Sequence, residues 1–250
     1  MGARPLPAWL GPGAAAARGV GRFLDYTLLK PEATREDIMR LCDAAAAAGV
    51  RAVCVNGAWV TQCSRRLRGT GVLVAAVVDF PLGAASGAAK AAQAAIAAAD
   101  GAAELDMVIP LGAAKAGDWT AVTEDVAQVA SAAGTALVKA IIESAILTPE
   151  EITRACEAAV AGGAGFVKTS TGFHPSGGAT IAAVRLMRAA VDPAIGVKAS
   201  GGIRTSGQAL AMFAAGASRI GLSNRAGVHA IVGPEAPPLV ELLGRAGADA

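Results

Sequence analysis

The chain has 250 residues, a length at which single α/β barrels are common. Its core must be built from Ala, Val, Leu and Ile, because 54% of the residues are hydrophobic and only 4% are aromatic. The net charge of +2 and the absence of runs of like charge argue against a surface for nucleic acid or for a membrane.

The first residues predict an arm that precedes the folded domain. Residues 1–22 are rich in Ala, Gly, Pro and Arg, and Pro5, Pro7 and Pro12 interrupt any apolar run. We therefore expect neither a signal peptide nor a membrane span, but a flexible or loosely docked arm before a domain at 23–250. Because the cysteines form no CxxC pair and the chain has only 2 histidines, we expect reduced thiols of a cytoplasmic protein and no metal site.

From residue 23 onward, short apolar strands alternate with Ala-rich helical segments, a pattern typical of parallel βα units. Threonines predict where three of the helices begin, because Thr34, Thr148 and Thr205 each stand at an N-cap position. Gly49 and Gly216 predict helix ends, since glycine readily adopts the left-handed conformation that closes a helix. The expected strands span residues 23–28, 52–56, 72–80, 103–109, 136–144, 165–171, 195–201 and 219–223.

This repeated alternation predicts an α/β protein that is a single closed (β/α)8 TIM barrel. The alternative is an open doubly wound sheet. No GxGxxG or GxxxxGK[ST] motif follows the first expected strand, so the nucleotide-binding fingerprint of that alternative is missing. In a barrel, catalytic residues are expected at the C-terminal ends of the strands and in the loops that follow.

Three lysines, Lys139, Lys168 and Lys198, fall inside expected strands. A buried ammonium group is costly unless it has a partner, so the barrel lumen is a better place for these side chains than a helix interface. Side chains alternate along a strand, which brings carboxylates to the same lumen as partners. These carboxylates are Glu104, Asp106 and Glu143.

Lys168 by itself fits either a structural ion pair or a reactive amine. A desolvated lysine beside a second cation has a lowered pKa and, once neutral, can form a Schiff base with a carbonyl substrate. Lys168 and Lys198 would be such a pair. Asp106 could then carry protons to and from the carbinolamine and the enamine carbon as a general acid and base.

Glycines follow the last three expected strands. Loops after strands seven and eight of such barrels often hold a phosphate group on backbone N–H groups, although the glycines could also serve only as turns. The residues concerned are Gly172, Gly201, Gly202 and Gly221, with Ser223 beside the last of them.

In order and spacing, seven segments resemble the 2-deoxyribose-5-phosphate aldolase family, class I (Schiff-base) aldolases with a (β/α)8 barrel. The segments are LDYTLLKP at 24–31, VCVN at 53–56, FPLG at 80–83, ELDMVI at 104–109, VKAIIE at 138–143, FVKTSTGF at 166–173 and VKASGGIR at 197–204.

The resemblance implies reversible cleavage of 2-deoxy-D-ribose 5-phosphate to D-glyceraldehyde 3-phosphate and acetaldehyde, with no metal or organic cofactor. Lys168 matches the Schiff-base lysine, Lys198 the lysine that perturbs it, and Asp106 the proton shuttle. The partners implied are a phosphorylated sugar and aldehydes, and a homodimer is compatible with the pattern. Matches to the small-substrate pocket are Asp25, Thr27, Cys54 and Thr169, and matches to the phosphate site are Gly172, Gly201, Gly202 and Ser223.

Two departures from the family pattern bear on function. Asp79 stands where glycine is usual, and if it faced the lumen it could weaken phosphate binding or alter the pKa of a lysine. In the eighth strand Leu222 and Asn224 differ from the family, and Arg225 could either join the phosphate or point to solvent. These departures leave open a class I aldolase for another aldehyde pair. A non-catalytic barrel is the remaining alternative, and the costly lumen lysines argue against it.

Overall fold

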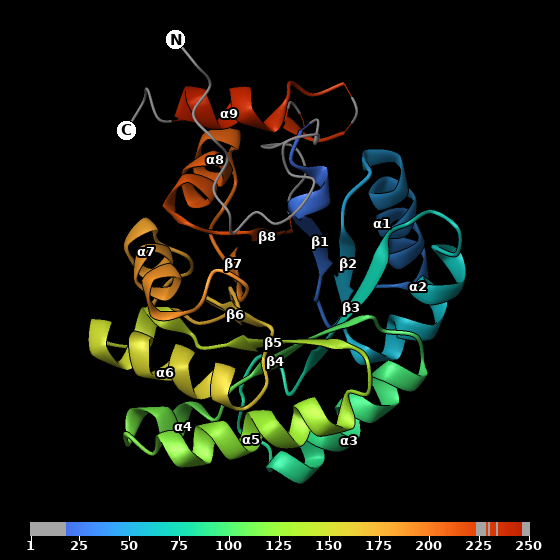
Figure 1. The fold of residues 1–250 in the computed structure, drawn as a ribbon. Coiled ribbons are helices and arrows are strands. Elements are labelled where there is room, and N and C mark those ends of the chain that lie inside the picture. Colours follow the sequence, from blue (N-terminus) through green and yellow to red (C-terminus); the bar gives the residue numbers. More distant parts are fainter. Residues whose placement is uncertain (1–18, 224–228, 230, 234, 247–250) are drawn as a thin grey trace.

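Eight parallel strands form a closed barrel in the computed structural model of the chain, which describes residues 19–223, 229, 231–233 and 235–246 (Figure 1). Each strand pairs with the next along the chain, and β8 pairs with β1 to close the ring. The expected (β/α)8 barrel is confirmed. The strands are β1 Leu24–Leu28, β2 Ala52–Val55, β3 Leu73–Val78, β4 Glu104–Val108, β5 Leu137–Ile141, β6 Phe166–Lys168, β7 Gly196–Ser200 and β8 Arg219–Leu222.

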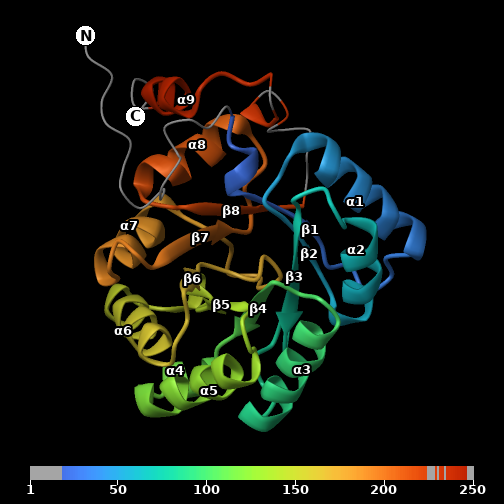
Figure 2. The same ribbon diagram turned by 45° about the vertical axis from the view of Figure 1, so that its right-hand side comes forward.

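Helices lie on the outside of the barrel in both ribbon views (Figures 1 and 2). Their apolar faces pack against the outward side chains of the strands and form the main hydrophobic core. The helices are α1 Arg35–Ala48, α2 Val60–Arg66, α3 Gly87–Ala99, α4 Leu111–Lys115, α5 Trp119–Ala132, α6 Pro149–Ala161, α7 Ile181–Ala190, α8 Ser206–Ala215 and α9 Leu239–Ala246. Short 3-10 turns span Gly21–Phe23, Gly57–Trp59 and Ser144–Ile146.

The predicted helix starts and ends are confirmed. Thr34, Thr148 and Thr205 each accept a hydrogen bond from the backbone N–H three residues later, and each forms a reciprocal capping box. Gly49 and Gly216 end α1 and α8 with φ angles of 60° and 119°. Only glycine adopts such angles without a steric cost.

Strand alternation divides the interior into two layers. In β4, Leu105 and Met107 face the apolar core between strands and helices, whereas Glu104 and Asp106 face the lumen. All four side chains are buried. The barrel therefore holds its charged residues on the inside, closed off from the helices.

The end of the N-terminal arm is docked on the domain, while residues 1–18 lie outside the described residues. Gly19 N–H donates to the carbonyl of Pro237 at 2.8 Å, and Val20 N–H donates to the carbonyl of Ile231 at 2.7 Å. Val20 is buried in the core. The proposed division between an arm at 1–22 and a domain at 23–250 stays a prediction.

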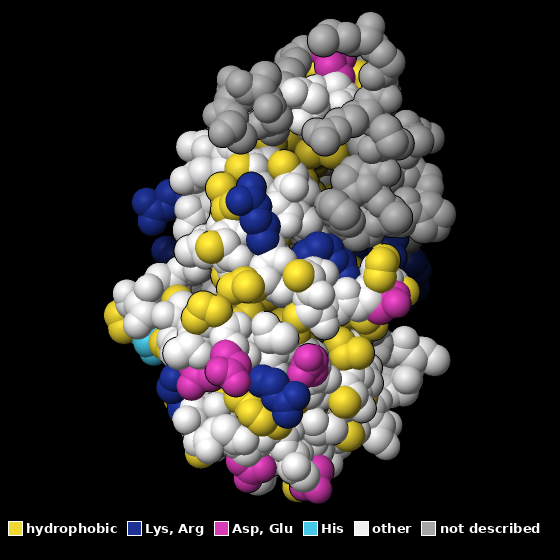
Figure 3. All heavy atoms as spheres, turned by 60° about the vertical axis from the view of Figure 1, so that its left-hand side comes forward, with side chains coloured by type: hydrophobic (Ala, Val, Ile, Leu, Met, Phe, Trp, Pro, Cys, Tyr) yellow, Lys and Arg dark blue, Asp and Glu magenta, His cyan; other side chains and the backbone are white. Residues whose placement is uncertain are grey.

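Acidic and basic side chains are interspersed on the face drawn in Figure 3. Ion pairs form between neighbouring helices and within one helix, for example Lys115 with Glu151 at 2.8 Å and Arg154 with Glu157 at 2.9 Å. Among the described residues, no helix is both long and apolar enough to cross a membrane.

Candidate active site

The barrel lumen holds a cluster of buried charged side chains, which we call the lumen cluster. Strands β1, β4, β5, β6, β7 and β8 each contribute to it, so its geometry follows directly from barrel closure. Its members are Asp25, Glu104, Asp106, Lys139, Lys168, Lys198 and Arg219, all of which are buried.

Asp106 lies at the centre of the lumen cluster. Its Oδ2 atom accepts a hydrogen bond from Lys168 Nζ at 2.7 Å and another from Lys198 Nζ at 2.7 Å. Its Oδ1 atom accepts from Lys139 Nζ at 2.6 Å. One carboxylate oxygen thus joins the two lysines that the sequence predicts to be a nucleophile and its neighbouring cation.

A second set of contacts lies on the other side of Lys198 and Lys139. Lys198 Nζ also donates to Asp25, whose other oxygen accepts from Arg219 Nη1 at 2.7 Å. Glu104 Oε2 lies 2.6 Å from Lys139 Nζ and 3.1 Å from Arg219 Nη1. The buried charges therefore alternate in sign, as a stable buried ion network requires.

The pKa values of the three lysines in the cluster shift in different directions. Burial lowers the pKa of Lys168 below its ordinary value; Asp106 opposes this shift and the nearby Lys198 adds to it. Burial also disfavours charge on Lys198 and Lys139, but Asp106 and the other carboxylates outweigh it and raise both pKa values. Lys168 is thus the amine of the cluster that most readily becomes neutral and nucleophilic.

Two carboxylates of the cluster, Asp106 and Asp25, have lowered pKa values. Burial alone would raise the pKa of Asp106, but Lys139, Lys168 and Lys198 together hold that pKa well below the ordinary value. The pKa of Asp25 is lowered in the same way, chiefly by Arg219 against the effect of burial. Asp106 is therefore ionised in this arrangement, and a proton that it took up would pass readily to a neighbouring amine.

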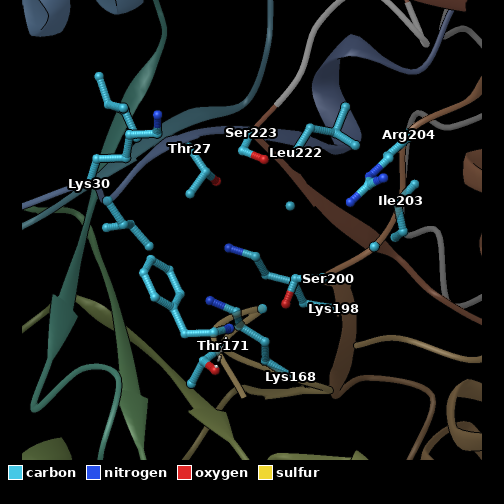
Figure 4. A pocket seen from close by; sticks show the side chains of 17 residues that line it. Thr27, Lys30, Lys168, Thr171, Lys198, Ser200, Ile203, Arg204, Leu222 and Ser223 are labelled. Carbon is cyan, nitrogen blue, oxygen red and sulfur yellow. Dashed lines mark hydrogen bonds between the residues drawn. The ribbon is translucent and has the colours of Figure 1, made fainter. Parts of the chain in front are cut away.

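A cavity of about 450 Å³ opens above the cluster. Figure 4 shows the side chains of Lys168 and Lys198 at this cavity, with Lys30 and Arg204 on opposite sides of it. Of the predicted residues, the cavity is lined by Thr27, Lys168, Gly172, Lys198, Gly201, Gly202 and Ser223.

Backbone forms one wall of the cavity where the loops after β6 and β7 meet. Gly172 and Gly201 have φ angles of 80° and 86°. A Cβ atom on Gly201 would lie 3.0 Å from the Cα of Gly178 and 3.1 Å from the Cα of Gly172, so only glycines allow these loops to touch. Around Gly202, which also lines the cavity, such an atom would meet nothing within 4 Å.

The other predicted residues lie outside the cavity lining. Asp25, Asp106 and Cys54 are fully buried below it, and Cys54 Sγ is 3.9 Å from Asp106 Oδ2. Burial raises the pKa of Cys54, so it remains a thiol. Thr169 faces away from the lumen, and its hydroxyl bridges β6 and β7 by donating to the Ser200 carbonyl and accepting from the Ser200 N–H.

Two expectations about acidic residues are corrected. Glu143 is not a partner of the lumen lysines: it follows β5 with a φ angle of 52°, and its carboxylate accepts hydrogen bonds from the hydroxyl and N–H of Thr171. Asp79 does not face the lumen, because its carboxylate accepts from the N–H of Ala85 and lies 3.8 Å from Lys90 Nζ. Both residues come after the regular strand, where side chains no longer alternate.

Arg219 is the functional residue that the sequence reasoning missed. Its guanidinium group lies in the lumen between Asp25 and Glu104. The signal was available, because Arg219 shares one face of the expected eighth strand with Gly221 and Ser223. Asn224 and Arg225, which bear on the expected phosphate site, lie outside the described residues.

A parallel (β/α)8 barrel whose lumen holds a lysine of lowered pKa, a second lysine and an aspartate that both lysines share, next to an open cavity, has the architecture of a lysine-dependent aldolase. The model of the DeoC/LacD family of aldolases matches residues 22–229. The chain belongs to this family.

Relatives of known name cover most of the chain. A deoxyribose-phosphate aldolase of Bacillus licheniformis is 52% identical over 86% of this chain and 95% of the relative. A deoxyribose-phosphate aldolase of Mycobacterium avium is 54% identical over 80% of this chain and 91% of the relative. Among solved structures, the tetrameric deoxyribose phosphate aldolase of Aeropyrum pernix superposes with a TM-score of 0.78 at 32% identity, covering 84% of this chain and 88% of that one.

Proposed function

We propose that the protein is a deoxyribose-phosphate aldolase that cleaves 2-deoxy-D-ribose 5-phosphate reversibly to D-glyceraldehyde 3-phosphate and acetaldehyde. The observation that carries this proposal is Lys168, a buried amine of lowered pKa at the cavity floor, which shares the Oδ2 atom of Asp106 with Lys198. Aldolase relatives of this name support the choice of substrate.

Neutral Lys168 attacks the aldehyde carbon, C1, of the open-chain sugar, and the carbinolamine loses water to give a protonated imine. The imine draws electrons from the C2–C3 bond. As this bond breaks, the C3 hydroxyl loses its proton and C3 becomes the aldehyde carbon of D-glyceraldehyde 3-phosphate. The enamine that remains is protonated at C2, and hydrolysis releases acetaldehyde and the free amine of Lys168.

Asp106 and Lys198 manage the protons of this sequence. Lys198 keeps its ammonium group, because carboxylates on both sides raise its pKa. Through the oxygen that it shares with Lys168, Asp106 can pass a proton between the ammonium group and the reacting atoms. Burial and the nearby ammonium group of Lys198 favour the neutral amine of Lys168 before the substrate arrives, whereas Asp106 opposes this shift.

The phosphate group would lie on the backbone wall of the cavity. Gly172, Gly201 and Gly202 line the cavity with main-chain groups, and Ser223, which follows β8, lines it with a hydroxyl group. Arg204 lines the same side of the cavity and adds a positive charge (Figure 4).

Reduction by borohydride in the presence of acetaldehyde tests the assignment of the nucleophile. We expect an ethyl group on the Nζ atom of Lys168, detected by peptide mass spectrometry. Lys168→Met should give no adduct, whereas Lys198→Met should still be modified at Lys168 but more slowly. An adduct on another lysine, or none in the unmodified protein, would contradict the mechanism.

A comparison of 2-deoxyribose with and without the 5-phosphate tests the phosphate site. Charged hydrogen bonds contribute about 1.5–3 kcal/mol each, so kcat/KM should be at least ~10-fold higher for the phosphorylated sugar. Ser223→Ala should reduce this ratio, mainly through KM of the phosphorylated substrate. Equal kcat/KM values would favour a class I aldolase for another aldehyde pair. Asp79 no longer supports that alternative, because its carboxylate faces away from the cavity.

We further propose that the enzyme acts in the cytoplasm, since its described cysteines are free thiols. The expected homodimer stays a prediction. The relative from Aeropyrum pernix is described as a tetramer. The mass measured by light scattering should therefore be compared with the masses of a dimer and of a tetramer.

A further inference from the structure

Glu104 and Arg219 lie at the base of the lumen cluster, farther from the cavity than Lys168 and Lys198, which line it. Glu104 is the first residue of β4 and is 1% exposed, and Arg219 is the first residue of β8 and is 6% exposed. Neither residue lines the cavity. They contact each other at 3.1 Å, and the guanidinium group also lies 5.4 Å from the ring centre of Phe166.

The charges of the lumen cluster do not balance. Three cations each contact at least two carboxylates: Lys139 contacts Glu104, Asp106 and, at 3.6 Å, Asp25; Lys198 contacts Asp25 and Asp106; and Arg219 contacts Asp25 and Glu104. Lys168 contacts Asp106 alone, through an oxygen that Lys198 also uses. When every group is ionised, the excess positive charge therefore falls on Lys168.

We propose that Glu104 and Arg219 are positioning residues that set how readily Lys168 loses its proton, by fixing the charge balance of the lumen cluster. This inference rests on the proposed role of Lys168 as the Schiff-base lysine. The two residues act through others: Glu104 competes with Asp106 for Lys139, and Arg219 competes with Lys198 for Asp25.

The two residues act in opposite directions. Without the charge of Glu104, Lys139 and Arg219 rely on the remaining carboxylates, so an ammonium group on Lys168 becomes less favourable. Without the charge of Arg219, Asp25 interacts more strongly with Lys198. Asp106 is then shared less with Lys198 and stabilises the ammonium group of Lys168 more strongly.

Other groups around the cluster do not change this balance. From β2 the lumen receives Cys54, which burial keeps as a neutral thiol. β3 contributes apolar side chains to the lumen, Ala75 and Val77. Arg51 lies 3.9 Å from Glu104, but its side chain is 48% exposed, so solvent screens its charge.

The test uses Glu104→Gln, Arg219→Met and the double variant of the full chain. Trapping by borohydride is followed against pH with acetaldehyde, which carries no titrating group. The midpoint of the trapping rate should fall by about one pH unit in Glu104→Gln and rise by about one unit in Arg219→Met, the lower end of the usual effect of one nearby charge. In the double variant the midpoint should return close to that of the unmodified protein.

Arg219→Lys provides the matched control, because it keeps the charge but loses the planar fork. Its midpoint should match that of the unmodified protein even if its rate is lower. If Arg219→Met does not fold, the comparison of Glu104→Gln with Arg219→Lys still tests the inference, because only Glu104→Gln should lower the midpoint. Midpoints that stay fixed, or that move in the same direction in both single variants, would overturn the inference. No trapping in the unmodified protein would instead contradict the proposed function.

Discussion

The pKa values of three lysines in one lumen shift in different directions because the lysines have different numbers of carboxylate partners. Lys139 contacts three carboxylates and Lys198 contacts two, whereas Lys168 contacts only Asp106. Residue type and burial are the same for all three. What distinguishes the nucleophile is the arrangement of its neighbours.

This difference predicts opposite effects of two equivalent substitutions on stability. Lys139→Met would leave Glu104 and Asp106 short of a buried partner and should lower the free energy of unfolding by about 3–5 kcal/mol. Lys168→Met removes the surplus cation and should leave the free energy of unfolding unchanged or raise it. Urea unfolding at neutral pH measures both values.

Aldehyde trapping and circular dichroism of the two variants provide the controls. Lys168→Met should be folded and inactive. If the two variants lost equal stability, the excess charge would not lie on Lys168, and the account of the cluster given above would be wrong.

Most lumen residues within the paired strands were predictable from the sequence, whereas residues that follow the last paired residue of a strand were not. Lys168, Lys198 and Asp106 stand out because charges are rare in short apolar strands, and alternation then brings them to one lumen. Glu143 and Asp79 follow the last paired residue of their strands and take left-handed backbone conformations. Thr169 lies just past β6, where alternation turns it toward β7 rather than the cavity.

At the scale of elements, Asp79 connects β3, the loop that follows it and α3. Its N–H donates to Gln93 Oε1 at 2.8 Å, and its carboxylate accepts from the N–H of Ala85 at 2.8 Å. The nearby Lys90 is fully buried and bonds to Asp125 at 2.8 Å and to the carbonyl of Val108 at 2.9 Å. Asp79 thus ties the loop to a buried ion pair that joins α3, α5 and the end of β4.

The stability of a variant at Asp79 should therefore depend on whether it keeps the hydrogen-bond acceptor for Ala85 and whether it tolerates the left-handed backbone. Asp79→Ala loses the acceptor for Ala85 and keeps the left-handed backbone, so it should destabilise the protein by about 1–3 kcal/mol. Asp79→Gly loses the acceptor but relieves the strain and should fall between Ala and the parent. Asp79→Asn keeps an acceptor and tolerates the backbone angle, and should cost least. Chemical unfolding ranks the series; an Asn variant as unstable as the Ala variant would show that charge next to Lys90 dominates.

Element starts were easier to predict than strand ends. Helix starts depend on a threonine and a residue three positions later, which the sequence shows directly. Strand ends depend on where the neighbouring strand stops. The strand expected at 165–171 ends at Lys168, because the N–H and hydroxyl of Thr171 bond to Glu143 rather than to β7.

At the scale of the whole molecule, the order of the strands and the closure of the barrel followed from the repeated βα pattern alone. The docking of Gly19 and Val20 on residues 231–237 could not be predicted, since it joins segments more than two hundred residues apart without a motif in either. Burial of Arg219 was also hidden at this scale. Its partners Asp25 and Glu104 come from distant strands and meet it only when β8 closes against β1.

The backbone wall of the cavity affects how this enzyme can evolve. Because Gly172, Gly178 and Gly201 meet main chain to main chain, no amino acid replacement can reshape that wall without pushing the two loops apart. The cavity is also lined by Phe173, which is half exposed and stacks edge-on against Phe80. Selection for new acceptor aldehydes should therefore accumulate changes at the aromatic side, while the glycine side stays the same in every descendant that keeps a phosphorylated substrate.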